Sequence, residues 1–141
     1  MGRILGIDFG ERRVGLAMSD PSGMIAQPLP TLTRRAGKRA PVQAMLDLAQ
    51  QHDIQAFVIG LPLALSGEET AWTAEVRSFG SKIAERSGKP VYYVDERMTS
   101  VRAEKTIRSL GLKKSERERK DRIDAAAAML ILQSWLDQPR A

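Results

Sequence analysis

Four acidic residues stand where the sequence around them is apolar. Asp8 lies near the end of an apolar segment at the start of the chain, and Asp95 and Glu96 close the apolar segment VYYV. A helical face that carries Asp124 also carries Ala128, Ile131 and Trp135. A carboxylate removed from water needs a cation or hydrogen-bond donors to offset its desolvation. These acids are therefore the first candidates for chemistry.

A divalent cation held by oxygen ligands would account for acids in such positions. The chain has no cysteine and one histidine, His52, so thiolate sites, histidine-rich sites and histidine-based triads are poor candidates. Carboxylates alone suit Mg²⁺ or Mn²⁺ better than zinc. Two such ions about 3.5–4 Å apart can activate a water and stabilise the leaving oxygen of a phosphodiester. The acids therefore indicate a metal-dependent nuclease.

Two of these positions also have an ordinary structural role open to them. Asp8 can end its strand by accepting hydrogen bonds from the turn backbone near Gly10. Asp121 and Asp124 fit the N-cap and N3 positions of a helix, where acids stabilise backbone N–H groups. Capping suits Asp121 better than Asp124, because Asp124 shares a face with apolar residues.

Asp95 and Glu96 are neighbours on one expected strand, so their side chains point to opposite faces of the sheet. Only one of them can therefore face Asp8, and the alternation does not choose between them. Either acid can instead pair at the surface with Arg97 or Arg102.

Positive charge is concentrated in residues 97–122. This segment holds ten basic and four acidic residues, a net charge of +6, which leaves −1 for the rest of a chain whose total is +5. The basic residues are Arg97, Arg102, Lys105, Arg108, Lys113, Lys114, Arg117, Arg119, Lys120 and Arg122. Such a segment favours a polyanionic partner, above all nucleic acid, although a solvated loop has the same composition.

Three strands are expected to open the fold. Residues 3–9 are apolar on both faces, which predicts a central position in a covered sheet. Residues 14–19 follow after a tight connection, so these two strands pair antiparallel. A third strand over about 25–33 contains Pro28 and Pro30, which favour an edge position.

Helices and strands then alternate. A helix is expected over about 41–52 and a strand at 56–60. The next helix has Trp72, Val76, Phe79 and Ile83 on one stripe and ends near Gly88, and a strand follows at 91–96. Thr99 or Ser100 then caps a helix with Ala103, Ile107 and Leu110 inward, followed by an exposed charged loop at 113–120 and a last helix from near Asp121. This order predicts an α/β fold with a mixed five-stranded sheet and helices on both faces.

Length and composition fit one globular domain over residues 1–141. The 141 residues are 43% hydrophobic and 28% charged, without a repeat or low-complexity linker. Asp8 interrupts the first apolar run too early for a signal peptide, and no segment is long enough to span a bilayer. We therefore expect a cytoplasmic location and no membrane partner.

Four motifs together resemble the YqgF/RuvX family, whose members are described as Holliday junction resolvases or pre-16S rRNA nucleases. The motifs are GIDFGERRVGLAMSD (6–20), VIGLPLALSGEE (58–69), VDERMTSVRAE (94–104) and DRIDAAAAMLILQSWLD (121–137). They follow the family's order and spacing and span nearly the whole chain. The resemblance implies an RNase H-like fold and a divalent-metal nuclease site.

The resemblance also assigns residues. The acids of the family's site fall on Asp8, Glu96 and Asp124, as catalytic residues and metal ligands, and this chooses Glu96 over Asp95. Arginines and hydroxyls beside the motifs, and lysines of the basic segment, are expected to contact phosphate. They are Arg12, Arg13, Arg97, Thr99, Ser100, Lys113, Lys114 and Lys120.

Two positions depart from the family pattern. Ala64 stands where members commonly carry Asn, so a polar role there is missing or is supplied by Ser66. Asp121 stands where the family more often has a non-acidic residue, and we expect it to be a helix cap rather than an additional metal-facing acid.

The expected activity is Mg²⁺- or Mn²⁺-dependent hydrolysis of structured RNA or branched DNA, with 16S rRNA precursor processing as the leading role. A Holliday junction resolvase and a non-catalytic ribosome-maturation factor are the alternatives. An actin- or Hsp70-like phosphotransferase, which GIDFG also resembles, ranks below them because that fold needs two such domains. The sequence leaves open whether the substrate is RNA or DNA, the polarity of cleavage, and whether the protein is a monomer or a homodimer.

Overall fold

The computed structural model describes residues 2–34, 40–98 and 117–139. Its elements are β1 (Arg3–Phe9), β2 (Arg13–Ser19), β3 (Ala26–Thr33), α1 (Val42–Gln51), β4 (Ile54–Leu61), α2 (Ala71–Ser87), β5 (Val91–Asp95), the 3-10 helix η1 (Glu96–Met98) and α4 (Arg117–Leu136).

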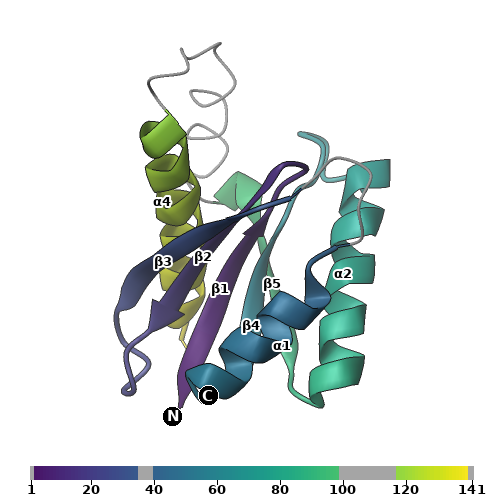
Figure 1. The fold of residues 1–141 in the computed structure, drawn as a ribbon. Coiled ribbons are helices and arrows are strands. Elements are labelled where there is room, and N and C mark those ends of the chain that lie inside the picture. Colours follow the sequence, from purple (N-terminus) through teal and green to yellow (C-terminus); the bar gives the residue numbers. More distant parts are fainter. Residues whose placement is uncertain (1, 35–39, 99–116, 140–141) are drawn as a thin grey trace.

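The five strands form one mixed sheet in the order β3-β2-β1-β4-β5 (Figure 1). β1 pairs antiparallel with β2, and β2 pairs antiparallel with β3. The pairs β1–β4 and β4–β5 are parallel. The expected mixed sheet with three antiparallel leading strands is therefore confirmed. So are the central place of β1 and the edge place of β3, the strand that carries Pro28 and Pro30.

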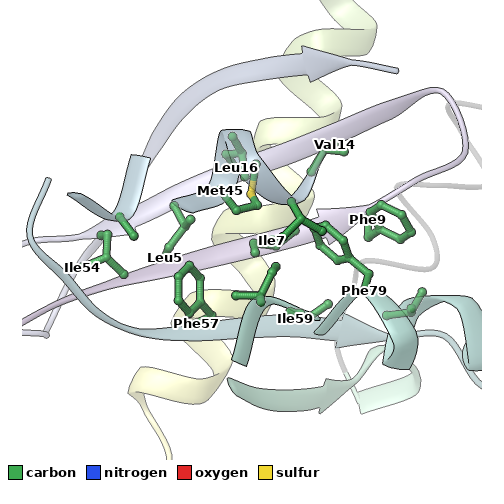
Figure 2. Close-up of a cluster of buried hydrophobic side chains, with 14 of the residues drawn as sticks. Leu5, Ile7, Phe9, Val14, Leu16, Met45, Ile54, Phe57, Ile59 and Phe79 are labelled. Atoms are coloured by element: carbon green, nitrogen blue, oxygen red, sulfur yellow. The ribbon is translucent and has the colours of Figure 1, made fainter. Parts of the chain in front are cut away.

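Helices cover both faces of the sheet, as the element order predicted (Figure 1). Leu5, Ile7 and Phe9 of β1 belong to the cluster under α1 and α2, which Figure 2 shows in close-up. Ile4 belongs to a second cluster with buried residues of α4. Because strand side chains alternate, the even-numbered positions of β1 face α4. Asp8 is one of them.

The α4 backbone lies unusually close to the sheet, and Gly15 of β2 makes this approach possible. A Cβ atom at Gly15 would lie 2.7 Å from the carbonyl carbon of Asp124 and nearer still to its oxygen. The residues of α4 that pack here are mostly small or fully buried, namely Ala127, Ala128, Ile131 and Leu132. The helix and the strand are thus fixed to one another at the level of Asp124.

Local signals fix the ends of α2. The Thr70 hydroxyl accepts from the Thr73 N–H, and the Thr73 hydroxyl accepts from the Thr70 N–H, which forms a capping box. At the other end Gly88 is left-handed, with a φ of 69°, so the predicted stop at this glycine is confirmed. No helix in the described part of the chain is long and apolar enough to cross a membrane.

The start of α4 corrects two expectations. The helix begins at Arg117, so the last four residues of the expected charged loop, 117–120, are helical. Arg, Glu and Lys are good helix formers, and a charged run is compatible with a solvated helix as well as with a loop. Asp121 consequently lies inside the helix and is not its N-cap. The helix expected after Thr99 or Ser100, and residues 113–116, lie outside the described residues.

Candidate active site

Three of the candidate acids lie at one end of the sheet, on the face that α4 covers. β1, β4 and β5 run parallel, so their carboxyl ends meet at the same edge. Asp8 is the penultimate residue of β1, and Glu96 directly follows β5. This edge of a parallel sheet is the usual location of ligand sites in α/β proteins.

Asp8 and Asp124 both lie beside Gly15 of β2. Asp8 pairs in the ladder with Gly15, and the backbone of Asp124 lies against the same glycine. Both acids are almost fully buried, with exposed fractions of 2% for Asp8 and 1% for Asp124. Because Gly15 has no side chain, α4 can lie close to the end of β1. Two acids from opposite ends of the sequence are thereby brought to the same place.

The strand alternation of β5 decides between Glu96 and Asp95. Tyr92 stacks on Trp135 of α4 with ring centroids 5.0 Å apart, and Val94 lies in the cluster beneath α4. The strand ends at Asp95, one residue before the expected end, and Glu96 is the first residue of η1. Glu96 nevertheless lies on the same side as Tyr92 and Val94 and is 3% exposed. Its Oε1 would lie 2.8 Å from a Cβ at Gly60, so the carboxylate shares with the Ile131 side chain the space that this glycine leaves on β4.

Asp95 has a different environment. Its carboxylate accepts from Arg97 at 2.7 Å, and both side chains are partly exposed. This hydrogen bond raises the pKa of Arg97 above its usual value. Arg97 also donates to the carbonyl of Leu65 in the loop after β4. Asp95 therefore has the surface pairing that the sequence left open for either acid.

Asp124 forms an ion pair with a residue that was expected to contact phosphate. The Nε atom of Arg13, the first residue of β2, lies 2.9 Å from Asp124 Oδ2. The Asp124 side chain is 2% exposed, whereas that of Arg13 is 26% exposed. The guanidinium thus reaches from the solvent edge of the site to a buried carboxylate.

The donor chemistry of these residues fits a hard divalent cation. The three acids supply oxygen atoms only, and the Glu96 carboxylate occupies a space that a Cβ at Gly60 would fill. Within residues 2–34, 40–98 and 117–139, no three His, Cys, Asp or Glu side chains have the mutual spacing of a metal site. In the structure the three acids therefore lie on one face of the sheet, and Asp124 forms an ion pair with the guanidinium of Arg13.

The other expected phosphate contacts are spread around this edge. Arg12 is exposed in the turn between β1 and β2, and Arg97 is exposed after β5. Thr99, Ser100, Lys113 and Lys114 lie outside the described residues. For Lys120 the structure describes the backbone in α4 and not the side chain.

The loop after β4 shows how the departure at Ala64 is accommodated. The Ala64 N–H donates to the carbonyl of Glu68, and the Gly67 N–H donates to the carbonyl of Ala64. The Ser66 hydroxyl accepts from the Glu68 N–H. Ser66 therefore stabilises its own loop by a local hydrogen bond.

Arg34 is a residue of this region that the sequence did not single out. Its side chain donates to the carbonyl of Gly10 at 2.8 Å, and its guanidinium lies 4.4 Å from the centroid of the Phe9 ring. Phe9 in turn stacks on Trp72 and Phe79. Arg34 thereby supports the turn that follows Asp8. No local pattern could indicate this role, because Arg34 and Gly10 are 24 residues apart.

Known proteins resemble this chain over nearly its whole length. The family model described as "RuvX: Holliday junction resolvase" matches residues 2–138. A protein of Koribacter versatilis named "Putative pre-16S rRNA nuclease" is 42% identical over 137 residues, which cover 97% of this chain and 88% of that one. A protein of the same name from Maridesulfovibrio salexigens is 40% identical, with 95% and 97% covered.

A likeness to a solved structure concerns the fold alone. The structure of Thermus thermophilus RuvC in complex with a Holliday junction substrate matches with a TM-score of 0.55 and 16% identity, covering 96% of this chain and 94% of that one. The RNase H-like fold that the sequence motifs implied is thereby confirmed.

Proposed function

The chain belongs to the RuvX family, and on that premise we propose that it is a divalent-metal-dependent nuclease of structured nucleic acid, with Asp8, Glu96 and Asp124 as its catalytic residues. The observation that carries this proposal is the burial of all three carboxylates on the α4 face, at the carboxyl ends of β1 and β5. The desolvation of acids with exposed fractions of 1–3% must be offset by cations or hydrogen-bond donors, and a divalent cation at this edge would contribute to that.

The three acids would hold Mg²⁺ or Mn²⁺, which supplies neutralisation of charge on the phosphate and a more acidic water. The protein's part is positioning. The backbone of Asp124 is fixed against Gly15, and Glu96 is fixed over Gly60. Burial of the carboxylates lowers the local dielectric constant, so their interaction with a cation is stronger than in water.

The cationic residues around the edge would bind the nucleic-acid backbone. Arg13 pairs with Asp124, Arg12 precedes it in the β1–β2 turn, and Arg97 follows Glu96 in the sequence. The segment 97–122 carries a net charge of +6. Phosphate contacts of this kind release counterions, so binding should weaken steeply as salt rises. The proposed set of contacts also includes Thr99, Ser100, Lys113, Lys114 and Lys120.

We take 16S rRNA precursor as the leading substrate because curated relatives about 40% identical carry that name. The description of the family model favours branched DNA as the second candidate. In either case the activity would reside in one domain, residues 1–141, acting in the cytoplasm.

A cleavage assay on both substrates tests the site. Wild type, Asp8→Asn, Glu96→Gln and Asp124→Asn are incubated with a structured 16S precursor RNA and with a four-way DNA junction, in Mn²⁺, Mg²⁺ or EDTA. Loss of an outer-shell partner of a metal already costs about 10–100-fold, so loss of a ligand should reduce cleavage by more than about 100-fold. The matched control is Asp95→Asn, which neutralises the neighbouring acid on the other face and should retain cleavage.

Equal cleavage by wild type and Asp8→Asn would refute the assigned site. Binding of RNA with no metal-dependent cleavage of either substrate would instead identify a non-catalytic ribosome-maturation factor. Preference for the junction over the RNA would favour the second substrate.

A further inference from the structure

Arg13 and Asp124 form the ion pair that ties the solvent edge of the site to its buried interior. The two residues are 111 positions apart in the sequence, and the bond joins β2 to α4. Arg13 follows directly on the exposed Arg12 of the β1–β2 turn. One end of the pair is therefore a proposed cation ligand, and the other is a guanidinium in the place where a phosphate backbone would arrive.

A guanidinium and a divalent cation are alternative partners for the same carboxylate oxygen. Arg13 Nε lies 2.9 Å from Asp124 Oδ2, a distance typical of a charge-assisted hydrogen bond. A positive charge at that distance also repels a second cation. While the pair is intact, Arg13 both occupies a ligand atom and disfavours a dication beside it.

We infer that Arg13 is a positioning residue that exchanges partners: it holds Asp124 in the metal-free protein and turns to a substrate phosphate when a divalent cation takes the carboxylate. This inference rests on the proposed function, because it needs the cation site. The exchange replaces one arginine–carboxylate pair by one cation–carboxylate contact and one arginine–phosphate contact. Asp124 is paired with a positive charge both before and after the exchange.

The exchange couples two binding events. Nucleic acid that engages Arg13 releases Asp124 for the cation, and a cation at Asp124 releases Arg13 for the nucleic acid. Each ligand should therefore strengthen the binding of the other by the same factor. Arg13 in a merely structural role would make no such connection.

Mn²⁺ binding is the first measurement, by calorimetry and by electron paramagnetic resonance of the free ion, without nucleic acid. Arg13→Ala should bind Mn²⁺ about tenfold more tightly than wild type, which corresponds to the loss of one modest charge repulsion. Arg13→Lys keeps the charge and should stay nearer to wild type. The matched control is Arg77→Ala, which removes an arginine from an exposed pair with Glu69 and should leave Mn²⁺ affinity unchanged.

RNA binding in EDTA is the second measurement, on a short RNA hairpin, where no cleavage takes place. Asp124→Asn releases Arg13 and should tighten RNA binding by about tenfold, the value of one charged hydrogen bond. The double variant Arg13→Ala/Asp124→Asn should lose that gain. The double variant removes both charges of the pair, so it can be compared with Asp124→Asn even if Arg13→Ala alone folds poorly. Asp8→Asn removes the same negative charge without releasing Arg13, and any gain it shows should persist when Arg13 is replaced.

Unchanged or weaker Mn²⁺ binding by Arg13→Ala, together with loss of binding in Asp8→Asn, would overturn the exchange and leave the proposed cation site standing. A gain in RNA binding by Asp124→Asn that survives replacement of Arg13 would overturn it as well. Absence of Mn²⁺ binding in the wild-type protein, with and without RNA, would overturn the proposed metal dependence and the exchange with it.

Discussion

Replacement of Gly15 by alanine should separate α4 from the sheet at the level of Asp124. The added Cβ would lie 2.7 Å from the carbonyl carbon of Asp124 and 3.3 Å from its Cα. Carbon atoms in contact prefer about 3.5–4.0 Å, so one of the two backbones must move by about 1 Å. Neither is a flexible side-chain end, and both lie in the buried interior.

The cost follows from the packing around this point. Overpacking of a core usually costs about 1–3 kcal/mol, and a clash between two backbones belongs at the upper end of that range. We therefore expect Gly15→Ala to lower the free energy of unfolding by about 3 kcal/mol. For a chain of this size each kcal/mol shifts Tm by about 3 °C, so Tm should fall by about 10 °C. Displacement of Asp124 by about 1 Å should also reduce cleavage by about 100-fold at temperatures where the variant is folded.

Urea unfolding, thermal unfolding and Mn²⁺-dependent cleavage measure these effects together. Gly88→Ala is the matched control, because it makes the same chemical change at a glycine with open space around it and a positive φ. Its strained backbone should cost about 1 kcal/mol. It is the C-cap of α2, before β5 begins at Val91 and so at the opposite end of that strand from Glu96, and cleavage should be retained. A Gly15→Ala protein at least as stable as Gly88→Ala, with normal cleavage, would refute the close approach of α4.

Three further perturbations address other parts of the molecule. Gly60→Ala should weaken Mn²⁺ binding and cleavage and also lower the free energy of unfolding, because its Cβ would meet both the Glu96 carboxylate and the buried Ile131 side chain; calorimetry and urea unfolding measure the two effects, and unchanged Mn²⁺ binding would contradict the prediction. Thr70→Ala should lower the free energy of unfolding by about 1 kcal/mol through loss of the helix cap and leave cleavage intact, as urea unfolding and the cleavage assay would show. The Ser22 hydroxyl is the main cause that lowers the pKa of Asp20 from 3.8 to about 2, with backbone N–H groups adding to it. Stability from Asp20 is therefore present above pH 3.8 and lost as the pH falls toward 2; carboxyl NMR should give a midpoint near 2 in wild type and a higher one in Ser22→Ala.

The sheet was predictable because its signals are local. β1 is apolar on both faces, which requires cover on both sides and hence a central place. Pro28 and Pro30 have no backbone N–H to donate to a neighbouring strand, so their strand must lie at an edge of the sheet. Each pattern indicates which faces or edges of a segment must be covered, and few arrangements of one sheet and its helices satisfy all of these requirements.

The site was only partly predictable, because it depends on contacts between distant segments. Strand alternation places Asp95 and Glu96 on opposite faces, but the face that matters is set by α4, which begins more than 20 residues later. The family resemblance, and not the pattern, chose Glu96. The partner of Arg13 is 111 residues away in the sequence. The motif around Arg13 suggested a contact with phosphate, but it could not indicate an ion pair with Asp124.

The error at the start of α4 has a physical cause as well. The residues 117–120 are all charged, a composition typical of an exposed loop. Charge reports exposure to solvent, not backbone conformation, and these residue types have high helix propensity. With the start at Arg117, Asp124 lies two turns inside the helix rather than in its first turn.

The position of α4 also determines when the chemistry can first exist. The strands β1 to β5 lie within residues 3–95, but Asp124 comes to lie beside Gly15 of β2 only when α4 docks on the sheet. On the ribosome, residues 117–136 are made after the sheet strands, so a nascent chain carries Asp8 and Glu96 before it carries Asp124. If the three acids form the proposed site, the nuclease would stay inactive during its own synthesis, beside the rRNA and mRNA that surround it, until α4 has packed on the sheet.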